Sequence, residues 1–185
     1  MRVVEIGCGD NAGPFFKNAT EHFAVDISPL RVQNAVDNEP RFTPMVADAT
    51  NLDGIDDSSV HVLLARNVFG DPFLGLERGL ALDLSFTQRE DDESRKAKLD
   101  VVRRKLAVVA EAARILTTGG QLLVVEQYTP EYAEEFIDQV NDGTLLRPAS
   151  LAPFEQVELS DVTPKDYSRR HFNATTWVST AVNHK

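Results

Sequence analysis

Short apolar runs recur along the chain, and each of them ends at polar, glycine or proline residues. Uninterrupted apolar runs are typical of strands that are covered on both faces in a parallel sheet. The pattern predicts seven strands, over residues 2–6, 22–27, 42–47, 60–65, 121–126, 154–159 and 172–181.

The clearest helix is predicted over residues 95–116, because its apolar side chains recur at spacings of three and four and form one stripe. Gly119 and Gly120 follow this segment, and they predict a C-terminal cap, since glycine adopts the left-handed conformation that ends many helices. Shorter helices are predicted over residues 13–18, 29–36 and 130–140.

Strands that alternate with helices predict an α/β domain with a mostly parallel sheet, right-handed crossovers and helices on both faces. The last two strands differ, because residues 161–171 between them have no helical pattern, so the last strand is predicted to be antiparallel. We expect one domain over residues 1–185. Within it, the segment 71–94 could be an insertion that builds a lid or substrate wall. The alternative for its charged end, residues 88–98, is a solvated turn and helix start.

Size and composition exclude several classes of function. The net charge is −10 with a pI near 4.8, which disfavours direct binding to nucleic acid, because such a partner needs a basic face. No apolar run reaches the ~20 residues that a membrane-spanning helix needs. A single cysteine cannot form an internal disulfide, and this fits a cytoplasmic location. Cysteine and histidine show no metal-binding spacing, so no metal is expected.

Candidate chemistry begins at the segment VVEIGCGDNAG, where the first predicted strand leads into a glycine loop. Gly7 and Gly9 permit backbone angles that side chains forbid, and they let a ligand approach the main chain closely. The pattern G-x-G-x-x-A is shared by many nucleotide-binding folds. Its meaning here depends on Glu5 before the loop and on two acids downstream.

Those two acids, Asp26 and Asp48, end the second and third predicted strands, and ligands bind where the carboxyl ends of parallel strands meet. Asp26 could accept hydrogen bonds from two ribose hydroxyls, and Asp48 could accept from an exocyclic amine beside the Ala49 amide. Glu5 lies near where an ammonium or sulfonium would sit. Alternative roles stay open: Asp26 as a helix cap, Asp48 as a turn cap before Thr50, and Glu5 as a buried acid bonded to backbone amides.

Taken in order, the motifs VVEIGCG, AVDIS, VADAT and the helix–GGQLLVVE unit resemble the class I S-adenosylmethionine-dependent methyltransferases. The resemblance runs across the whole chain. It implies a Rossmann-like, seven-stranded, mostly parallel sheet with an antiparallel last strand. It also implies S-adenosyl-L-methionine as the cofactor and a small-molecule or protein methyl acceptor.

The resemblance further implies a set of cofactor-binding residues, namely Glu5, Gly7, Cys8, Gly9, Asp26, Ile27, Asp48, Ala49 and Asn67. The glycine loop would line the methionine portion, whose amino group Glu5 would orient. Asp26 would hold the ribose, with Ile27 packed on the adenine, and the pair after the third strand would read the adenine edge. Asn67 would lie closest to the transferred methyl group.

Substrate contacts are less specific. Asp71, Gln127 and Tyr128 lie near predicted strand ends and are candidates for the substrate wall, with an ordinary loop role as the alternative. No catalytic base is identified. Asn11 stands where the family usually has another glycine. The sequence Asn-Val-Phe-Gly at 67–70 lacks the Asn/Asp-Pro-Pro-aromatic signature of enzymes that methylate base or amide nitrogens, which disfavours such acceptors.

Two other functions stay open. Strand-like sequence begins at Arg2 with no helical sequence before it, so one end of the ligand cleft is expected to lack a cover, in a minimal or trimmed chain. A degenerate, non-catalytic cofactor-binding or scaffold domain would fit that feature. An NAD(P)-dependent oxidoreductase would fit the glycine pattern with Asp26, but Glu5, Asp48 and the antiparallel end of the sheet argue against it. The oligomeric state is not indicated.

Overall fold

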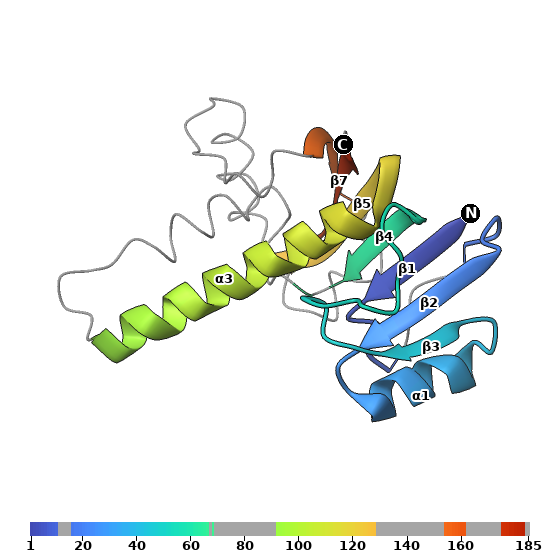
Figure 1. The fold of residues 1–185 in the computed structure, drawn as a ribbon, viewed down its shortest axis with the longest axis horizontal. Coiled ribbons are helices and arrows are strands. Elements are labelled where there is room, and N and C mark those ends of the chain that lie inside the picture. The colour runs from blue at the N-terminus through green and yellow to red at the C-terminus, as the bar shows by residue number, and fades with distance from the viewer. Residues whose placement is uncertain (11–15, 67, 69–91, 129–153, 162–174, 184–185) are drawn as a thin grey trace.

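A seven-stranded sheet organises the part of the chain that the computed structural model describes, which comprises residues 1–10, 16–66, 68, 92–128, 154–161 and 175–183. The strand order is β3-β2-β1-β4-β5-β7-β6 (Figure 1). The predicted fold class is therefore confirmed, including the number of strands within the described residues.

Five strands run parallel to one another: β1 (Arg2–Ile6), β2 (Glu21–Asp26), β3 (Thr43–Val46), β4 (Val60–Arg66) and β5 (Leu116–Tyr128). The last strand, β7 (Thr175–Asn183), lies between β5 and β6 (Phe154–Asp161) and is antiparallel to both. The antiparallel last strand that the sequence predicts is confirmed. The strand order reverses between β1 and β4, and this switch point is where open α/β sheets bind ligands.

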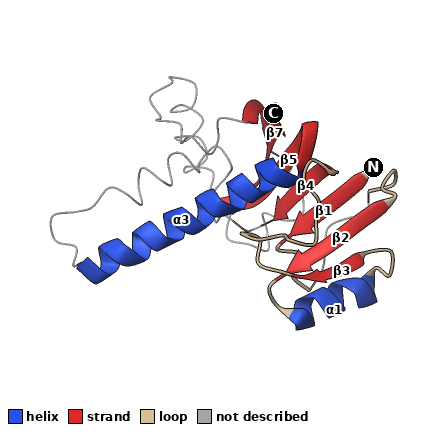
Figure 2. Ribbon diagram, in the orientation of Figure 1, coloured by secondary structure: helices blue, strands red, loops and turns tan. Residues whose placement is uncertain are grey.

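Helices cover both faces of the sheet (Figure 2). Alternate residues of a strand face opposite sides, and in β2 Val25 packs in the cluster that contains α3 (Asp92–Ile115). The preceding residue, Ala24, packs instead with α1 (Pro29–Asn38). Among the α3 residues whose burial is described, the buried ones lie between Val108 and Ile115. Figure 1 shows the N-terminal half of this helix extending beyond the sheet.

The predicted glycine cap of the long helix is wrong. The helix α3 ends at Ile115, and both glycines lie in β5, where the pairing with β4 shifts register and Gly119 has φ +75°. The carbonyls at the end of the helix bind elsewhere: the amides of Ser58 and Ser59 donate to the carbonyls of residues 114 and 115. The side-chain amide of Asn183 donates to the carbonyl oxygens of residues 113, 116 and 117, at 3.4, 3.0 and 3.3 Å.

Several other predictions fall wholly or partly outside the described residues. The helix predicted over 130–140 lies outside them, as do Asn67 and most of the segment 71–94. The last three residues of that segment begin α3 rather than belonging to an insertion. Within the segment 13–18, the described residues 17 and 18 form a turn. No helix in the described ranges is long and apolar enough to cross a membrane.

Candidate functional site

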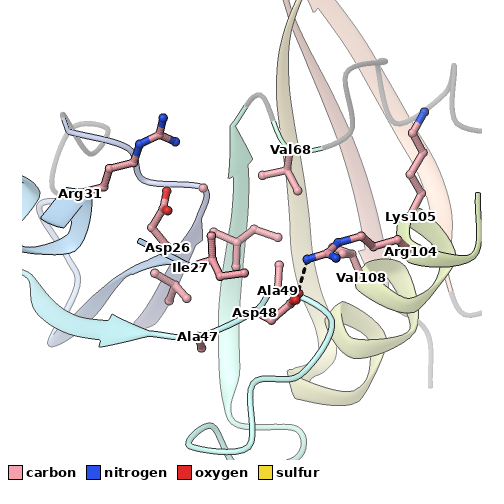
Figure 3. A pocket seen from close by; sticks show the side chains of 13 residues that line it. Asp26, Ile27, Arg31, Ala47, Asp48, Ala49, Val68, Arg104, Lys105 and Val108 are labelled. Carbon is pink, nitrogen blue, oxygen red and sulfur yellow. Dashed lines mark hydrogen bonds and ion pairs between the residues drawn. The ribbon is translucent and has the colours of Figure 1, made fainter. Parts of the chain in front are cut away.

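A pocket of about 530 Å³ lies at the carboxyl ends of the parallel strands, a size typical of small-molecule sites. It brings together residues that the sequence predicts to bind a cofactor, namely Gly7, Asp26, Ile27, Asp48 and Ala49. Figure 3 shows the side chains of Asp26 and Ile27 on one wall, and those of Arg104, Lys105 and Val108 reaching the pocket from α3.

The other predicted site residues do not line this pocket or are not described there. Cys8 and Gly9 follow Gly7 in the loop beside the pocket, whereas Glu5 is buried elsewhere. Asn67 and Asp71 lie outside the described residues. The backbones of Gln127 and Tyr128 end β5 and pair with β7, but the description of these two residues does not extend to their side chains.

The turn after β1 requires glycine for two reasons. Gly7 has φ +68° and Gly9 has φ +59°, in the left-handed region that side chains rarely adopt. A Cβ atom on Gly7 would also lie 2.6 Å from Cγ2 of Val68 and 3.1 Å from the carbonyl oxygen of Arg66. The close approach at Gly7 is therefore to the chain leaving β4, whereas a Cβ on Gly9 would meet open space.

Cys8 is held inside the loop as a packing residue. Its amide donates to the carbonyl oxygen of Val25 at 3.1 Å, and its side chain is buried. Burial, followed by the negative charges of Asp26 and Glu5, raises the pKa of the Cys8 thiol to about 12. The thiol is therefore protonated at neutral pH and is not a nucleophile there.

Asp26 is fixed by backbone donors on both carboxylate oxygens. The amide of Gly9 donates to Oδ2 at 3.2 Å, and the amide of Ser28 donates to Oδ1 at 2.9 Å. The helix cap itself is Ser28, so Asp26 orders the approach to α1 without being its N-cap. Each carboxylate oxygen accepts more than one hydrogen bond, so these contacts leave capacity for ligand hydroxyls.

Asp48 forms the turn cap that the alternative interpretation predicts, and it also lines the pocket. Its Oδ1 accepts from the amide and hydroxyl of Thr50 at 3.0 and 2.9 Å, and its Oδ2 accepts from Nη2 of Arg104 at 2.6 Å (Figure 3). The Thr50 amide, then the Thr50 hydroxyl and the charge of Arg104, lower the pKa of Asp48. Asp48 is therefore ionised at neutral pH.

Glu5 faces away from the pocket because its neighbour Ile6 faces the pocket, and successive strand residues point to opposite sides. Its fully buried carboxylate lies 3.2 Å from Nη2 of Arg66 and 3.8 Å from Nε2 of His22. An arginine side chain is thus one partner of this carboxylate. Burial lowers the pKa of His22 to about 4, so this histidine is neutral at pH 7 and edge-packed against Phe42.

Sequence reasoning missed the basic residues at this site, namely Arg31, Arg66, Arg104 and Lys105. Arg66 carried a signal, because it is a charged residue directly after the apolar run that predicts β4. Arg104 carried a weaker one, since it lies off the apolar stripe of α3. Neither feature of the sequence indicates which acidic residue the arginine pairs with.

This chain is similar to known proteins in its structure. No model of a protein family and no curated protein matches the sequence. N-methyltransferase NodS from Bradyrhizobium japonicum WM9, in complex with S-adenosyl-L-homocysteine, matches at a TM-score of 0.58 and 12% identity, over 100% of this chain and 78% of that chain. Geranyl diphosphate C-methyltransferase from Streptomyces coelicolor A3(2) matches at a TM-score of 0.56 and 12% identity, over 98% and 69%.

The chain has the fold of these methyltransferases. Their fold also serves other reactions, because the [4+2]-cyclase SpnF matches at a TM-score of 0.58 and 16% identity, over 99% of this chain and 74% of that chain. A methyltransferase fold at such identities therefore establishes the architecture, and activity has to be argued from the site.

The pocket of this methyltransferase fold suits a nucleoside. Asp26 and Asp48 offer carboxylate acceptors at two positions, and Ile27 leaves 64% of its surface exposed, where an aromatic ring could cover it. Among the described residues, no atom lies within 4 Å of the place that a Cβ on Gly9 would take, so a ligand could approach the main chain there. These features fit the adenosine and methionine portions that the family resemblance implies.

Proposed function

We propose that this chain is a methyltransferase that moves a methyl group from S-adenosyl-L-methionine to a small-molecule or protein acceptor. The observation that carries the proposal is the convergence of Asp26 and Asp48, at the ends of neighbouring strands, on the pocket that Gly7 also lines. A cytoplasmic location stays a prediction from the single cysteine.

The residues take the following roles in this proposal. Asp26 binds the ribose hydroxyls, and the exposed side chain of Ile27 packs on the adenine. Asp48 accepts from the adenine amine, and the amide of Ala49 donates to a ring nitrogen. The loop Gly7–Gly9 lines the methionine portion, and Asn67 lies closest to the transferred methyl group.

Methyl transfer from a sulfonium requires mainly that the methyl group and the acceptor atom are aligned. Bound S-adenosylmethionine supplies a methyl group on a sulfonium, from which the thioether leaves readily. The chain contributes a pre-organised nucleoside site, since Asp26 is already held by two amides and Asp48 by Thr50 and Arg104. Alignment of this kind contributes about 7–11 kcal/mol in favourable reactions.

Calorimetry distinguishes this proposal from the two other functions. We expect S-adenosylhomocysteine to bind, and NAD⁺ and NADP⁺ not to bind. Binding of a nicotinamide cofactor alone would support an oxidoreductase, and binding of none of the three would support a scaffold. Turnover then separates an enzyme from a cofactor-binding domain: we expect labelled methyl groups to appear in an extract of small molecules or proteins.

Asp26→Ala tests the site itself. Loss of charge-assisted hydrogen bonds to the ribose is expected to weaken S-adenosylhomocysteine binding by about 1.5–3 kcal/mol. The control is Asp37→Ala, which removes an exposed acid of α1 whose partner is Gln33. Equal affinity of the Asp26 variant and the wild type in calorimetry would remove Asp26 from the site.

A further inference from the structure

We propose that Arg66 is a positioning residue that fixes the glycine loop for the methionine portion of the cofactor, and that Glu5 acts through Arg66 rather than on the ligand. This inference rests on the proposed function and deepens it. The juxtaposition that carries it is a buried acid of β1, the last residue of β4 and a carbonyl of the loop.

The sheet brings these groups together. Residues 6 and 65 pair across β1 and β4, so Arg66 lies level with the turn that follows β1. Nη2 of Arg66 donates to the carbonyl oxygen of Cys8 at 3.0 Å and lies 3.2 Å from Oε1 of Glu5. One guanidinium nitrogen therefore ties the loop to the buried carboxylate.

The loop is held from both neighbouring strands. On the side of β2, the amide of Cys8 donates to the carbonyl of Val25, and the amide of Gly9 donates to Asp26. On the side of β4, the described contact is the one from Arg66 to the Cys8 carbonyl. Loss of Arg66 therefore releases the loop on one side while its bonds to β2 stay in place.

Arg66 supplies a positive charge as well as a hydrogen-bond donor, and a neutral donor would not compensate the charge of Glu5. Glu5 has no exposed surface, and burying a carboxylate without a compensating charge is costly. The nearby His22 is neutral at pH 7, because burial holds its pKa near 4. The charge of Arg66 lowers the pKa of the Cys8 thiol, whereas burial, Asp26 and Glu5 raise it.

Ligands that contain one or both halves of the cofactor distinguish positioning of the loop from a purely structural role of Arg66. In the proposed site the adenosine half would contact residues held by β2, β3 and α3, whereas the methionine half would contact the loop. S-adenosylhomocysteine contains both halves, and 5′-methylthioadenosine lacks the amino-acid group. Arg66→Gln is expected to weaken S-adenosylhomocysteine about tenfold or more while 5′-methylthioadenosine changes less than about threefold.

A second set of variants separates positioning from burial of charge. In Glu5→Gln/Arg66→Gln the uncompensated carboxylate is gone, so the melting temperature is expected to recover relative to Arg66→Gln alone. The affinity for S-adenosylhomocysteine is expected to stay low, because the Cys8 carbonyl still lacks its donor. Arg66→Lys keeps a charge and one donor, and it covers the case in which Arg66→Gln does not fold; partial recovery of affinity is expected there. Arg41→Gln, which removes an exposed arginine paired with Glu39, is the control.

The outcomes are distinct. Equal weakening of both ligands, unchanged binding of both, or full return of S-adenosylhomocysteine binding in the double variant would each overturn the role of Arg66. Failure of the wild type to bind either ligand would instead overturn the proposed function, and this inference with it.

Discussion

The two faces of the sheet bury different chemistry. The face under α3 is an apolar cluster that includes Leu63, Val109 and Ile115. The face under α1 buries the carboxylate of Glu5 and the imidazole of His22 beside Phe42, directly behind the glycine loop. The first face supplies stability by packing, whereas the second holds a carboxylate and a neutral imidazole in fixed positions next to the candidate site.

The same substitution on each face gives the sharpest test of this difference. Val109→Ala in α3 is expected to cost about 2–3 kcal/mol of unfolding free energy, because it leaves a cavity in a large apolar cluster. Val32→Ala in α1 is expected to cost about 1–2 kcal/mol, because the described cluster around it is smaller. Urea denaturation measures both, and a larger loss in the Val32 variant would reverse the comparison.

Acid should affect the α1 face through His22. The pKa of His22 is lowered from 6.5 to about 4, so the unfolded chain binds a proton at higher pH than the folded chain does. The stability contributed by the neutral imidazole is therefore complete above pH 6.5 and is lost as the pH falls toward 4, by up to about 3 kcal/mol.

His22→Phe tests that window, because phenylalanine cannot titrate. Denaturation at pH 7, 5.5 and 4.5 is expected to show a smaller decline in the variant than in the wild type. Parallel declines in the two proteins would assign the acid sensitivity to other groups.

The contact between α3 and the pocket should have the smallest effect on stability. Arg104 is 63% exposed, so Arg104→Ala is expected to change unfolding free energy by only about 0.2–1 kcal/mol. The pKa of Asp48 should rise only partly, since the Thr50 amide is the largest cause of its lowering. Carbon-13 titration of the Asp48 carboxyl measures this, with Arg103→Ala as the neighbouring control. A full return to the ordinary pKa would mean that Arg104 and not Thr50 dominates.

The sequence predicts most of the fold because apolar residues recur at different spacings in strands and in helices. It also predicts that Asp26 and Asp48 meet, since the carboxyl ends of parallel strands lie at one edge of a sheet. The direction of Glu5 was within reach, because a period of two puts Glu5 and Ile6 on opposite faces. The distance from Glu5 to the glycine loop does not by itself indicate that direction.

Pairings between distant residues were beyond such reasoning. The bond from Arg66 to the Cys8 carbonyl depends on β4 lying next to β1, and the bond from Arg104 to Asp48 joins residues 56 positions apart. Gly119 and Gly120 misled for a related reason. Their spacing fits a helix end, but the carbonyls there are bound by Asn183, a residue that no local pattern connects to α3.

That link between Asn183 and α3 has a consequence for synthesis of the protein. Asn183 follows Ala113, whose carbonyl it binds, by 70 positions. At ordinary ribosome speeds this separation corresponds to roughly 4–14 s of translation. Throughout that interval the carbonyls of residues 113, 116 and 117 lack the side chain that binds them in the folded protein, whereas Ser58 and Ser59 are already available to the carbonyls of residues 114 and 115. The bonds from Asn183 form only after β7 has been synthesised and has joined the sheet.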